Sequence, residues 1–393
     1  MTPSRLPAVD REALVATRRD LHAHPELGFQ ETRTGGIIAA RLEELGYQVR
    51  SHVGRTGVVG LKGHGGRCVL LRADMDALPV EEANEVPYRS RNPGRMHACG
   101  HDGHVAIGLE VARRLARFPG TGAGAGAVKF AFQPAEEISD GAGAMIADGV
   151  LEQPHVDAAF GLHLWNTMPV GTIGLMAGPI MASVDQFEIT VTGTGGHAAM
   201  PHLAVDPVLA AAQVVTALQS LVSRRRDPFE PAVVSVTQLA AGHAFNVIPE
   251  RAVLRGTVRT FGGRFFDAAP RLLEDTARAT AAAFGADVSV DYRRLSGPLV
   301  NDAAMTQIMQ AVAEDLVGKQ HVKHGVRTMG GEDMSYFLER VPGCFALVGA
   351  ARPDGSSFPH HSPRFDIEEE SLVIGAELLS RTAVRYLTET GAG

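Results

Sequence analysis

The segment from Met96 to His104 reads MHACGHDGH and gathers one cysteine, three histidines and an aspartate within nine residues. Cys99 and His101 are two positions apart, which is too close for one face of a helix, where ligands lie three or four residues apart. Glycines at 100 and 103 allow the backbone to bend tightly. We therefore expect a loop whose alternate side chains converge on a metal ion. Taken alone, the segment fits a histidine-rich surface loop with a buried cysteine equally well.

Further ligand-type side chains follow short apolar runs elsewhere in the chain. They are Asp74-Met75-Asp76, Glu136-Glu137, His163 and His360-His361. Each has an ordinary explanation when taken singly: a solvated helix start for the glutamates, a core residue for His163, and an exposed loop for the histidine pair. Functional loops of α/β sheets lie at the carboxyl ends of strands. The shared position of these groups after apolar runs therefore favours one metal site.

The donor types indicate which metals such a site would hold. A thiolate, imidazoles and carboxylates suit zinc, cobalt, nickel or manganese, whereas calcium and magnesium sites use oxygen ligands. One thiolate can bridge two cations, and two ions roughly 3.5–4 Å apart would polarise a carbonyl and generate hydroxide near neutral pH. Of the two neighbouring glutamates, Glu137 would then be a ligand and Glu136 a free base. This pattern predicts two divalent transition-metal ions and metal-assisted hydrolysis.

Bulk composition narrows the class of protein. The chain has 393 residues, 45% hydrophobic and 21% charged, which is typical of a globular protein of two or three domains. A net charge of -7 argues against a nucleic-acid partner. Three cysteines, Cys68, Cys99 and Cys344, do not make a disulfide framework and indicate a reducing compartment, so we expect the cytoplasm. We expect neither a secretory signal nor a membrane span, because no apolar run is long enough.

Local patterns predict a split domain with an insertion. Helices are expected at 11–24, 34–45, 105–118 and 142–148, strands at 58–61, 69–72, 128–133 and 158–164, and a glycine-alanine loop at 120–126. This order is typical of an α/β domain with a mostly parallel sheet. From 184 the pattern changes to strands at 185–193, 232–240 and 252–259 with helices at 207–222 and 270–283, and after Pro298 the first pattern resumes and ends in a helix at 371–387. We therefore expect a split α/β catalytic domain, 1–183 and 297–393, with an inserted α+β domain at 184–296.

Motifs along nearly the whole chain carry a family resemblance. They are DLHAHPELG (20–28), RADMDALP (72–79), MHACGHDGH (96–104), FQPAEE (132–137), GLH (161–163), GGHAA (195–199), NVIP (246–249), GGED (330–333) and HSP (361–363). In this order they resemble the hippurate hydrolase and N-acyl-amino-acid amidohydrolase branch of the aminoacylase and carboxypeptidase-G superfamily. Members of that superfamily are binuclear metallohydrolases.

The resemblance implies roles for individual residues. Cys99 would bridge two metals, His101 and His163 would complete one of them, and Glu137 and His361 the other, with His360 as an alternative to His361. Glu136 would be the general base and later the acid that protonates the leaving amine. Asp76 would orient a ligand, as carboxylates behind metal ligands do.

The inserted domain resembles the lid and dimerisation domain of the same family. There His197 would help to hold the oxyanion, often from the partner subunit, and Asn246 and Arg259 would grip the substrate carboxylate. Without the resemblance, His197 is a histidine of a glycine-rich turn and Arg259 an exposed strand residue. The resemblance also implies a homodimer or a tetramer.

The predicted function is hydrolysis of the amide bond of an N-acyl-amino acid, either hippurate-like or N-acetylated, to a carboxylic acid and a free amino acid. A dipeptidase or carboxypeptidase with the same metal chemistry is the nearest alternative, although Cys99 in place of an aspartate weighs against it. Two further hypotheses are a non-catalytic binding protein on a decayed hydrolase scaffold and a redox-sensing role for Cys99.

Overall fold

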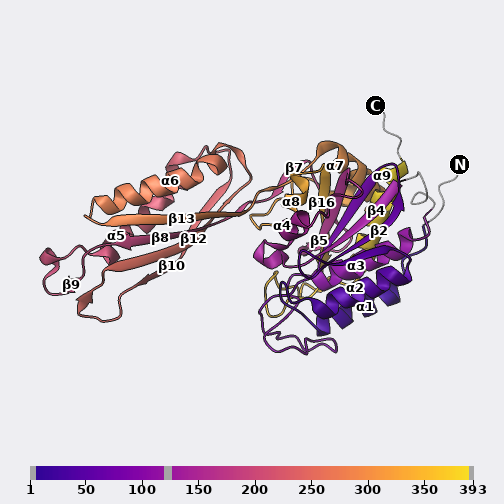
Figure 1. Cartoon of the computed structure of the whole chain (residues 1–393), viewed down its shortest axis with the longest axis horizontal. Coiled ribbons are helices and arrows are strands. Elements are labelled where there is room, and N and C mark those ends of the chain that lie inside the picture. Colours follow the sequence, from indigo (N-terminus) through magenta and orange to yellow (C-terminus); the bar gives the residue numbers. More distant parts are fainter. Residues whose placement is uncertain (1–5, 119–125, 389–393) are drawn as a thin grey trace. The chain divides into compact units, whose positions relative to one another are not determined.

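The computed structural model describes residues 6–118 and 126–388 and divides into two compact units (Figure 1). Unit 1 comprises Met1–Ile180, Val300–Val326 and Asp333–Gly393, and unit 2 comprises Met181–Leu299 and Arg327–Glu332. Each unit has its own hydrophobic core. The predicted glycine-alanine loop at 120–126 lies outside the described residues, except for its last residue.

An eight-stranded sheet forms the centre of unit 1. Its strands are β1 (Gln48–Val53), β2 (Gly57–His64), β3 (Cys68–Asp74), β4 (Gly126–Gln133), β5 (Ala158–Pro169), β6 (Ile173–Gly174), β15 (Val322–Lys323) and β16 (Gly343–Ala351). They lie in the order β1-β2-β4-β3-β5-β16-β6-β15. The central strands β4, β3, β5 and β16 pair in parallel. Nearly every residue of these four strands is buried, as expected for a parallel sheet covered on both faces. The predicted α/β class with a mostly parallel sheet is confirmed.

Helices cover this sheet. They are α1 (Arg11–Ala23), α2 (Thr32–Glu44), α3 (His101–Leu115), α4 (Gly141–Ala147), α7 (Ala303–Val317), α8 (Ser335–Leu338) and α9 (Glu370–Thr388), with short 3-10 turns η2 (Glu136–Ile138) and η5 (Lys319–His321). Helices α3 and α9 pack against each other and against β3, and α1 packs on α3. Asp10 caps α1 by accepting the N–H of Ala13. Among the described helices, none has the length and apolar character that crossing a membrane requires.

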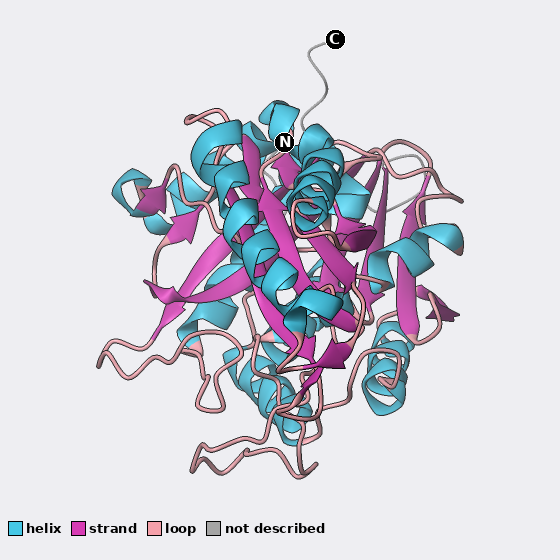
Figure 2. Cartoon of the chain, turned by 90° about the vertical axis from the view of Figure 1, so that its left-hand side faces the viewer, coloured by secondary structure: helices cyan, strands magenta, loops and turns pink. Residues whose placement is uncertain are grey.

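Unit 2 is a smaller α+β module, whose strands and helices are distinguished by colour in Figure 2. Its antiparallel sheet has the order β10 (Ala232–Ala241), β12 (Arg251–Thr260), β8 (Val184–Thr192) and β13 (Asp287–Ser296). The remaining elements are α5 (Pro207–Ser220), α6 (Gly263–Ala282), η3 (Pro201–Leu203), the π-turn η4 (Leu221–Arg225) and a small ladder of β9 (Gly196–His197) with β11 (Val247–Ile248). Alternate residues of β12 are buried, and α5 and α6 pack on this strand. The short strands β7 (Gly178–Met181) and β14 (Leu299–Asn301) pair where the chain passes between the units.

Several predicted element limits are wrong, and strands β1 and β13 were not predicted; the following three limits differ most from the structure. Helix α3 begins at His101 rather than at Val105, because Gly100 adopts φ +92° and turns the chain directly into the helix. Helix α6 begins at Gly263 and contains Pro270, since the buried apolar face of the helix outweighs one missing hydrogen bond. Strand β5 continues to Pro169 rather than ending at residue 164, so the histidine at 163 lies well inside the strand and not at its exit.

Candidate metal centre and active site

Five side chains from separate parts of unit 1 converge on one small region. Cys99 lies in the loop before α3, His101 is the first residue of α3, His163 lies on β5, Glu137 lies in η2, and His361 precedes α9. Ligand atoms of Cys99, His101 and His163 all lie within 4.8 Å of one another, and so do those of Cys99, Glu137 and His361. The sulfur is 3.4 Å from Nε2 of His163. The two groups of three therefore share Cys99.

The backbone around His361 separates two neighbouring histidines. His361 adopts φ +66°, a left-handed conformation that non-glycine residues rarely take, and its N–H donates to the carbonyl of Ala98 at 2.8 Å. Its Nε2 lies 3.3 Å from Oε2 of Glu137. His360 instead places Nε2 3.0 Å from the carbonyl of Leu164. Of the two histidines, His361 is therefore the one that lies beside Glu137.

Asp76 holds three of the predicted site residues at once. Its carboxylate accepts the backbone N–H of Glu136 at 3.0 Å and that of Glu137 at 3.1 Å. Its carbonyl oxygen lies 2.9 Å from Nδ1 of His101. Because a carbonyl only accepts, Nδ1 donates its proton to it, and Nε2 is the nitrogen of His101 that is left to bind a cation. Asp76 thus orients one predicted ligand, His101, and positions the turn that carries both glutamates.

Two buried atoms at the centre of this cluster have no hydrogen-bond partner among the described residues. They are Nε2 of His101 and Oε1 of Glu137, which lie 3.9 Å apart. A buried polar atom without a partner is costly, and a cation bound between these two atoms would satisfy both of them. Oε2 of the largely buried Glu136 is also 3.9 Å from Nε2 of His101. The cluster therefore fits a bound metal, with a further carboxylate beside it.

The pKa shifts of the site residues also favour a bound cation. Burial and the nearby Glu137 raise the pKa of the Cys99 thiol well above its usual value. Burial alone would lower the pKa of His101, but Asp74 and Asp76 outweigh it and raise the pKa. This excess of negative charge favours a cation, which would displace both protons. Burial, together with neighbouring histidines, lowers the pKa of His163 well below its usual value, which favours the neutral ring.

A buried polar layer behind the ligands was not predicted. Arg72 donates to Asp74 at 2.6 Å and to Asp333 at 3.1 Å. Asp333 also accepts from Nε2 of Gln133 at 2.6 Å and from the N–H of Ala142 at 3.1 Å. Charged residues within the buried end of β3 were the only local signal for this layer, because fully buried arginine and aspartate are rare unless they are paired. Asp333 therefore has a structural role in unit 1.

The three predicted substrate-binding residues lie in unit 2. His197 on β9 pairs with Val247 on β11, and the N–H of Ala198 donates to the carbonyl of Asn246 at 3.1 Å. His197 and Asn246 are exposed and line one surface pocket. Arg259 lies on β12 and is half-buried rather than exposed, and burial lowers its pKa although Asp185 opposes this effect.

Comparison with known proteins identifies the family. The model of Peptidase family M20/M25/M40 matches residues 70–385. The chain belongs to this family. It is 40% identical over 381 residues to the N-acetylcysteine deacetylase of Bacillus subtilis, covering 95% of this chain and 97% of that protein. It is 39% identical over 385 residues to the IAA-amino acid hydrolase ILR1-like 4 of Arabidopsis thaliana, covering 96% and 87%.

A solved structure agrees with this assignment. The YXEP protein of Bacillus subtilis, described as a dinuclear metal-binding peptidase of the M20 family, superimposes with a TM-score of 0.83 at 36% identity, covering 97% of this chain and 99% of that one. The predicted family and the predicted enzyme class are confirmed. This M20 chain is a metal-dependent amidohydrolase.

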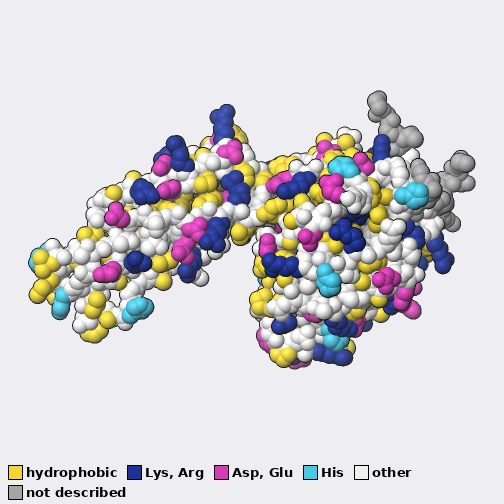
Figure 3. Space-filling model, viewed as in Figure 1, with side chains coloured by type: hydrophobic (Ala, Val, Ile, Leu, Met, Phe, Trp, Pro, Cys, Tyr) yellow, Lys and Arg dark blue, Asp and Glu magenta, His cyan; other side chains and the backbone are white. Residues whose placement is uncertain are grey.

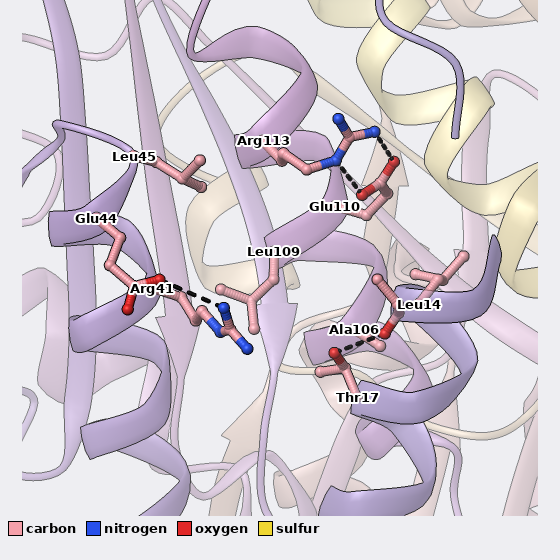
Figure 4. Close-up of a pocket in the computed structure, with 10 residues that line it drawn as sticks. Leu14, Thr17, Arg41, Glu44, Leu45, Ala106, Leu109, Glu110 and Arg113 are labelled. Atoms are coloured by element: carbon pink, nitrogen blue, oxygen red, sulfur yellow. Dashed lines mark hydrogen bonds and ion pairs between the residues drawn. The ribbon is translucent and has the colours of Figure 1, made fainter. Parts of the chain in front are cut away.

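A second surface pocket lies elsewhere on unit 1, between α1, α2 and α3 (Figure 4). Its charged groups are paired with one another: Arg113 donates to Glu110 at 2.8 Å, and Arg41 donates to Glu44 at 3.3 Å. None of the predicted site residues is among the residues that line it. We assign it no role in the reaction.

Proposed function

We propose that this amidohydrolase acts on N-acyl-amino acids and releases a carboxylic acid and a free amino acid. The observation that carries the proposal is the pair of ligand groups that share Cys99, with the carboxylate of Glu136 beside them. The names of two relatives, an N-acetylcysteine deacetylase and an IAA-amino acid hydrolase, support the substrate class.

The proposed cofactor is a pair of divalent transition-metal ions, chosen from manganese, zinc, cobalt and nickel. Cys99 would be shared, His101 and His163 would hold one ion, and Glu137 and His361 the other. When bound, the ions supply Lewis acidity that lowers the pKa of water and polarises a carbonyl. The unpartnered atoms of His101 and Glu137 support this assignment.

Glu136 is the proposed general base and acid. It takes the proton from the attacking water and returns it to the nitrogen of the leaving amino acid. The backbone N–H of Glu136 donates to Asp76, so the backbone that carries the proposed base is held in place. Restraint of this kind reduces the entropy lost in reaching the reactive arrangement.

Unit 2 is the proposed lid, and unit 1 the catalytic domain. Nδ1 of His197 accepts the N–H of Ala199 at 3.1 Å, so in the neutral ring Nε2 carries the proton and is free to donate to an oxyanion. Asn246, beside it in the same pocket, and Arg259 would bind the substrate carboxylate. An arginine suits this task because its guanidinium binds a carboxylate through two parallel hydrogen bonds.

We also propose that unit 2 forms a homodimer, alone or within a tetramer, so that His197 serves the site of the partner subunit. Large hydrophobic side chains are exposed on this unit (Figure 3). They include Met200, Leu203, Leu239, Phe245 and Val247, with Phe245 100% exposed. Strand β10 is also an edge strand of its sheet. Exposed apolar side chains and an edge strand both favour association, and light scattering after gel filtration would measure the subunit number.

The proposed compartment is the cytoplasm. Cys68, Cys99 and Cys344 are all buried free thiols. Burial raises the pKa of Cys68 to about 11 and that of Cys344 to about 12, so both are poor nucleophiles. Unpaired buried cysteines are typical of a reducing compartment.

The test of the function is amino-acid release from N-acetyl- and N-benzoyl-amino acids and from free dipeptides. Each substrate is assayed after chelation and again with manganese, cobalt or zinc added. We expect metal-dependent cleavage of the acylated substrates only. Cleavage confined to free dipeptides would make the enzyme a dipeptidase, and bound metal without cleavage of any substrate would contradict the proposed substrate class.

A further inference from the structure

Near the site, strand β5 extends beyond the end of its neighbouring strand β3. Pairing between β3 and β5 ends at Leu71 and Phe160, but β5 continues and still pairs with β16 at Leu164. The backbone groups of Leu164 that face away from β16 therefore have no strand to bind. Buried backbone groups require partners, so other groups must take the place of β3 there.

Histidine side chains supply these partners. The N–H of Leu164 donates to Nε2 of His104 at 2.9 Å. The carbonyl of Leu164 lies 2.9 Å from Nδ1 of His163 and 3.0 Å from Nε2 of His360. Three rings thus hold one residue of the strand, and that residue directly follows a proposed metal ligand.

The backbone groups that these rings contact determine which ring nitrogens carry a proton. Because an N–H only donates, Nε2 of His104 carries the lone pair and Nδ1 carries the proton. That proton is donated to Asp74 at 2.5 Å, and the other oxygen of Asp74 accepts from Arg72. Because a carbonyl only accepts, His163 is protonated on Nδ1. Its lone pair is therefore on Nε2, the atom that lies 3.4 Å from the sulfur of Cys99.

His104 is not a ligand in this arrangement. Its ligand atom lies within 4.8 Å of those of Asp74 and His101, but both of its ring nitrogens are engaged. The ring is 2% exposed, and it stacks on His101 with 5.4 Å between the ring centres. The side chain is therefore committed to its two hydrogen bonds.

We propose that His104 is a positioning residue that, held by Asp74, fixes the peptide joining His163 to Leu164 and thereby aims the Nε2 lone pair of His163 at the metal site. The inference rests on the metal centre of the proposed function. Partners that orient a metal ligand in this way typically change metal affinity 10- to 100-fold when they are lost.

The test compares metal binding in three variants at position 104 with a control. His104→Phe keeps a ring of similar size but loses both hydrogen bonds. His104→Gln keeps an oxygen that can accept the N–H of Leu164. His104→Ala leaves space that added imidazole can fill. The control, Val111→Ala, removes a fully buried side chain from the same helix, away from the ligands.

Binding is measured with cobalt alone, by chelator competition and by the visible absorption of the bound ion. The fluorescence of Trp165 gives a second signal, since this is the only tryptophan of the chain and its ring centre lies 5.4 Å from that of His163. Each protein is also assayed for kcat and KM with an N-acetyl-amino acid.

We expect His104→Phe and His104→Ala to bind cobalt 10- to 100-fold more weakly than the wild type and with an altered absorption spectrum. Affinity should return to within about threefold in His104→Gln and in His104→Ala with imidazole, and Val111→Ala should match the wild type. Should His104→Phe fail to fold, the alanine variant with and without imidazole decides the question.

Two results would overturn the inference. The first is wild-type affinity and spectrum in His104→Phe or His104→Ala, which would leave the metal centre intact but remove the role of His104. The second is an equal loss in Val111→Ala, which would reduce the effect to general destabilisation. A wild-type protein that binds no cobalt would instead refute the proposed metal centre, and this inference with it.

Discussion

The replacement Asp76→Asn tests how the active-site turn is held. The carboxylate of Asp76 accepts two backbone N–H groups, one on each oxygen, from Glu136 and Glu137. An amide of the same shape has only one oxygen, so one N–H must face the NH2 group of the new side chain. The variant keeps the volume of the side chain and changes only its charge and hydrogen bonding.

The size of the effect follows from the bond that is lost. A hydrogen bond to a charged group contributes about 1.5–3 kcal/mol. If the loss of this bond raises the activation free energy by the same amount, because the turn that carries Glu136 is held less well, kcat falls roughly 10- to 150-fold, at 1.36 kcal/mol per factor of ten. Cobalt affinity should fall too, because the turn also carries Glu137. The backbone carbonyl of Asp76 that accepts from His101 is unchanged in the variant, so His101 should stay in place.

The assay is steady-state kinetics with an N-acetyl-amino acid at saturating metal, together with cobalt titration. Asp157→Asn is the matched control, since Asp157 accepts the N–H of Cys68 at 2.7 Å at the start of β3, the end remote from the ligands. This control should leave kcat and metal affinity unchanged. A kcat within threefold of the wild type for Asp76→Asn, with unchanged cobalt affinity, would refute the reasoning.

Other predictions concern the base and the buried ion pairs. Glu136→Gln should retain its metal content but lose about 10²- to 10⁴-fold in kcat, and normal turnover would remove Glu136 as the base. Arg18 is fully buried and donates to Asp102 at 2.8 Å and Asp366 at 2.7 Å. Arg18→Met should therefore lower the free energy of unfolding by about 3–5 kcal/mol, and a loss below about 1 kcal/mol in urea denaturation would contradict this. Burial alone would raise the pKa of Asp366, but Arg18 holds the pKa below its usual value. Stability from this pair is therefore fully present above the ordinary aspartate pKa of about 4 and is lost as the pH falls through the lower folded value. Urea midpoints measured from pH 6 downward should fall less steeply in Asp366→Asn, and equal slopes would show that the pair does not contribute.

Much of the fold could be predicted from local patterns. The buried runs of β3, β4 and β5 and the alternation in β12 indicated an α/β sheet and a second, α+β region. Element limits were less predictable, because Gly100 starts α3 early and Pro270 is tolerated within α6. These limits depend on packing against other elements, which outweighs local propensity.

The candidate site, like the fold, could be predicted only in part from the sequence. The sequence by itself determined which donor types are present, in which order, and that their chemistry suits transition metals, because side-chain chemistry is a property of single residues. Only the tertiary structure brought the donor atoms around Cys99 together, separated His361 from His360, and placed His104 and Asp74 behind His163. The physical reason is that a hydrogen bond or a metal bond requires a particular distance and direction. Residues as far apart as Asp74, His104 and Leu164 acquire these only when β5 extends beyond β3 and leaves a backbone edge that side chains must satisfy.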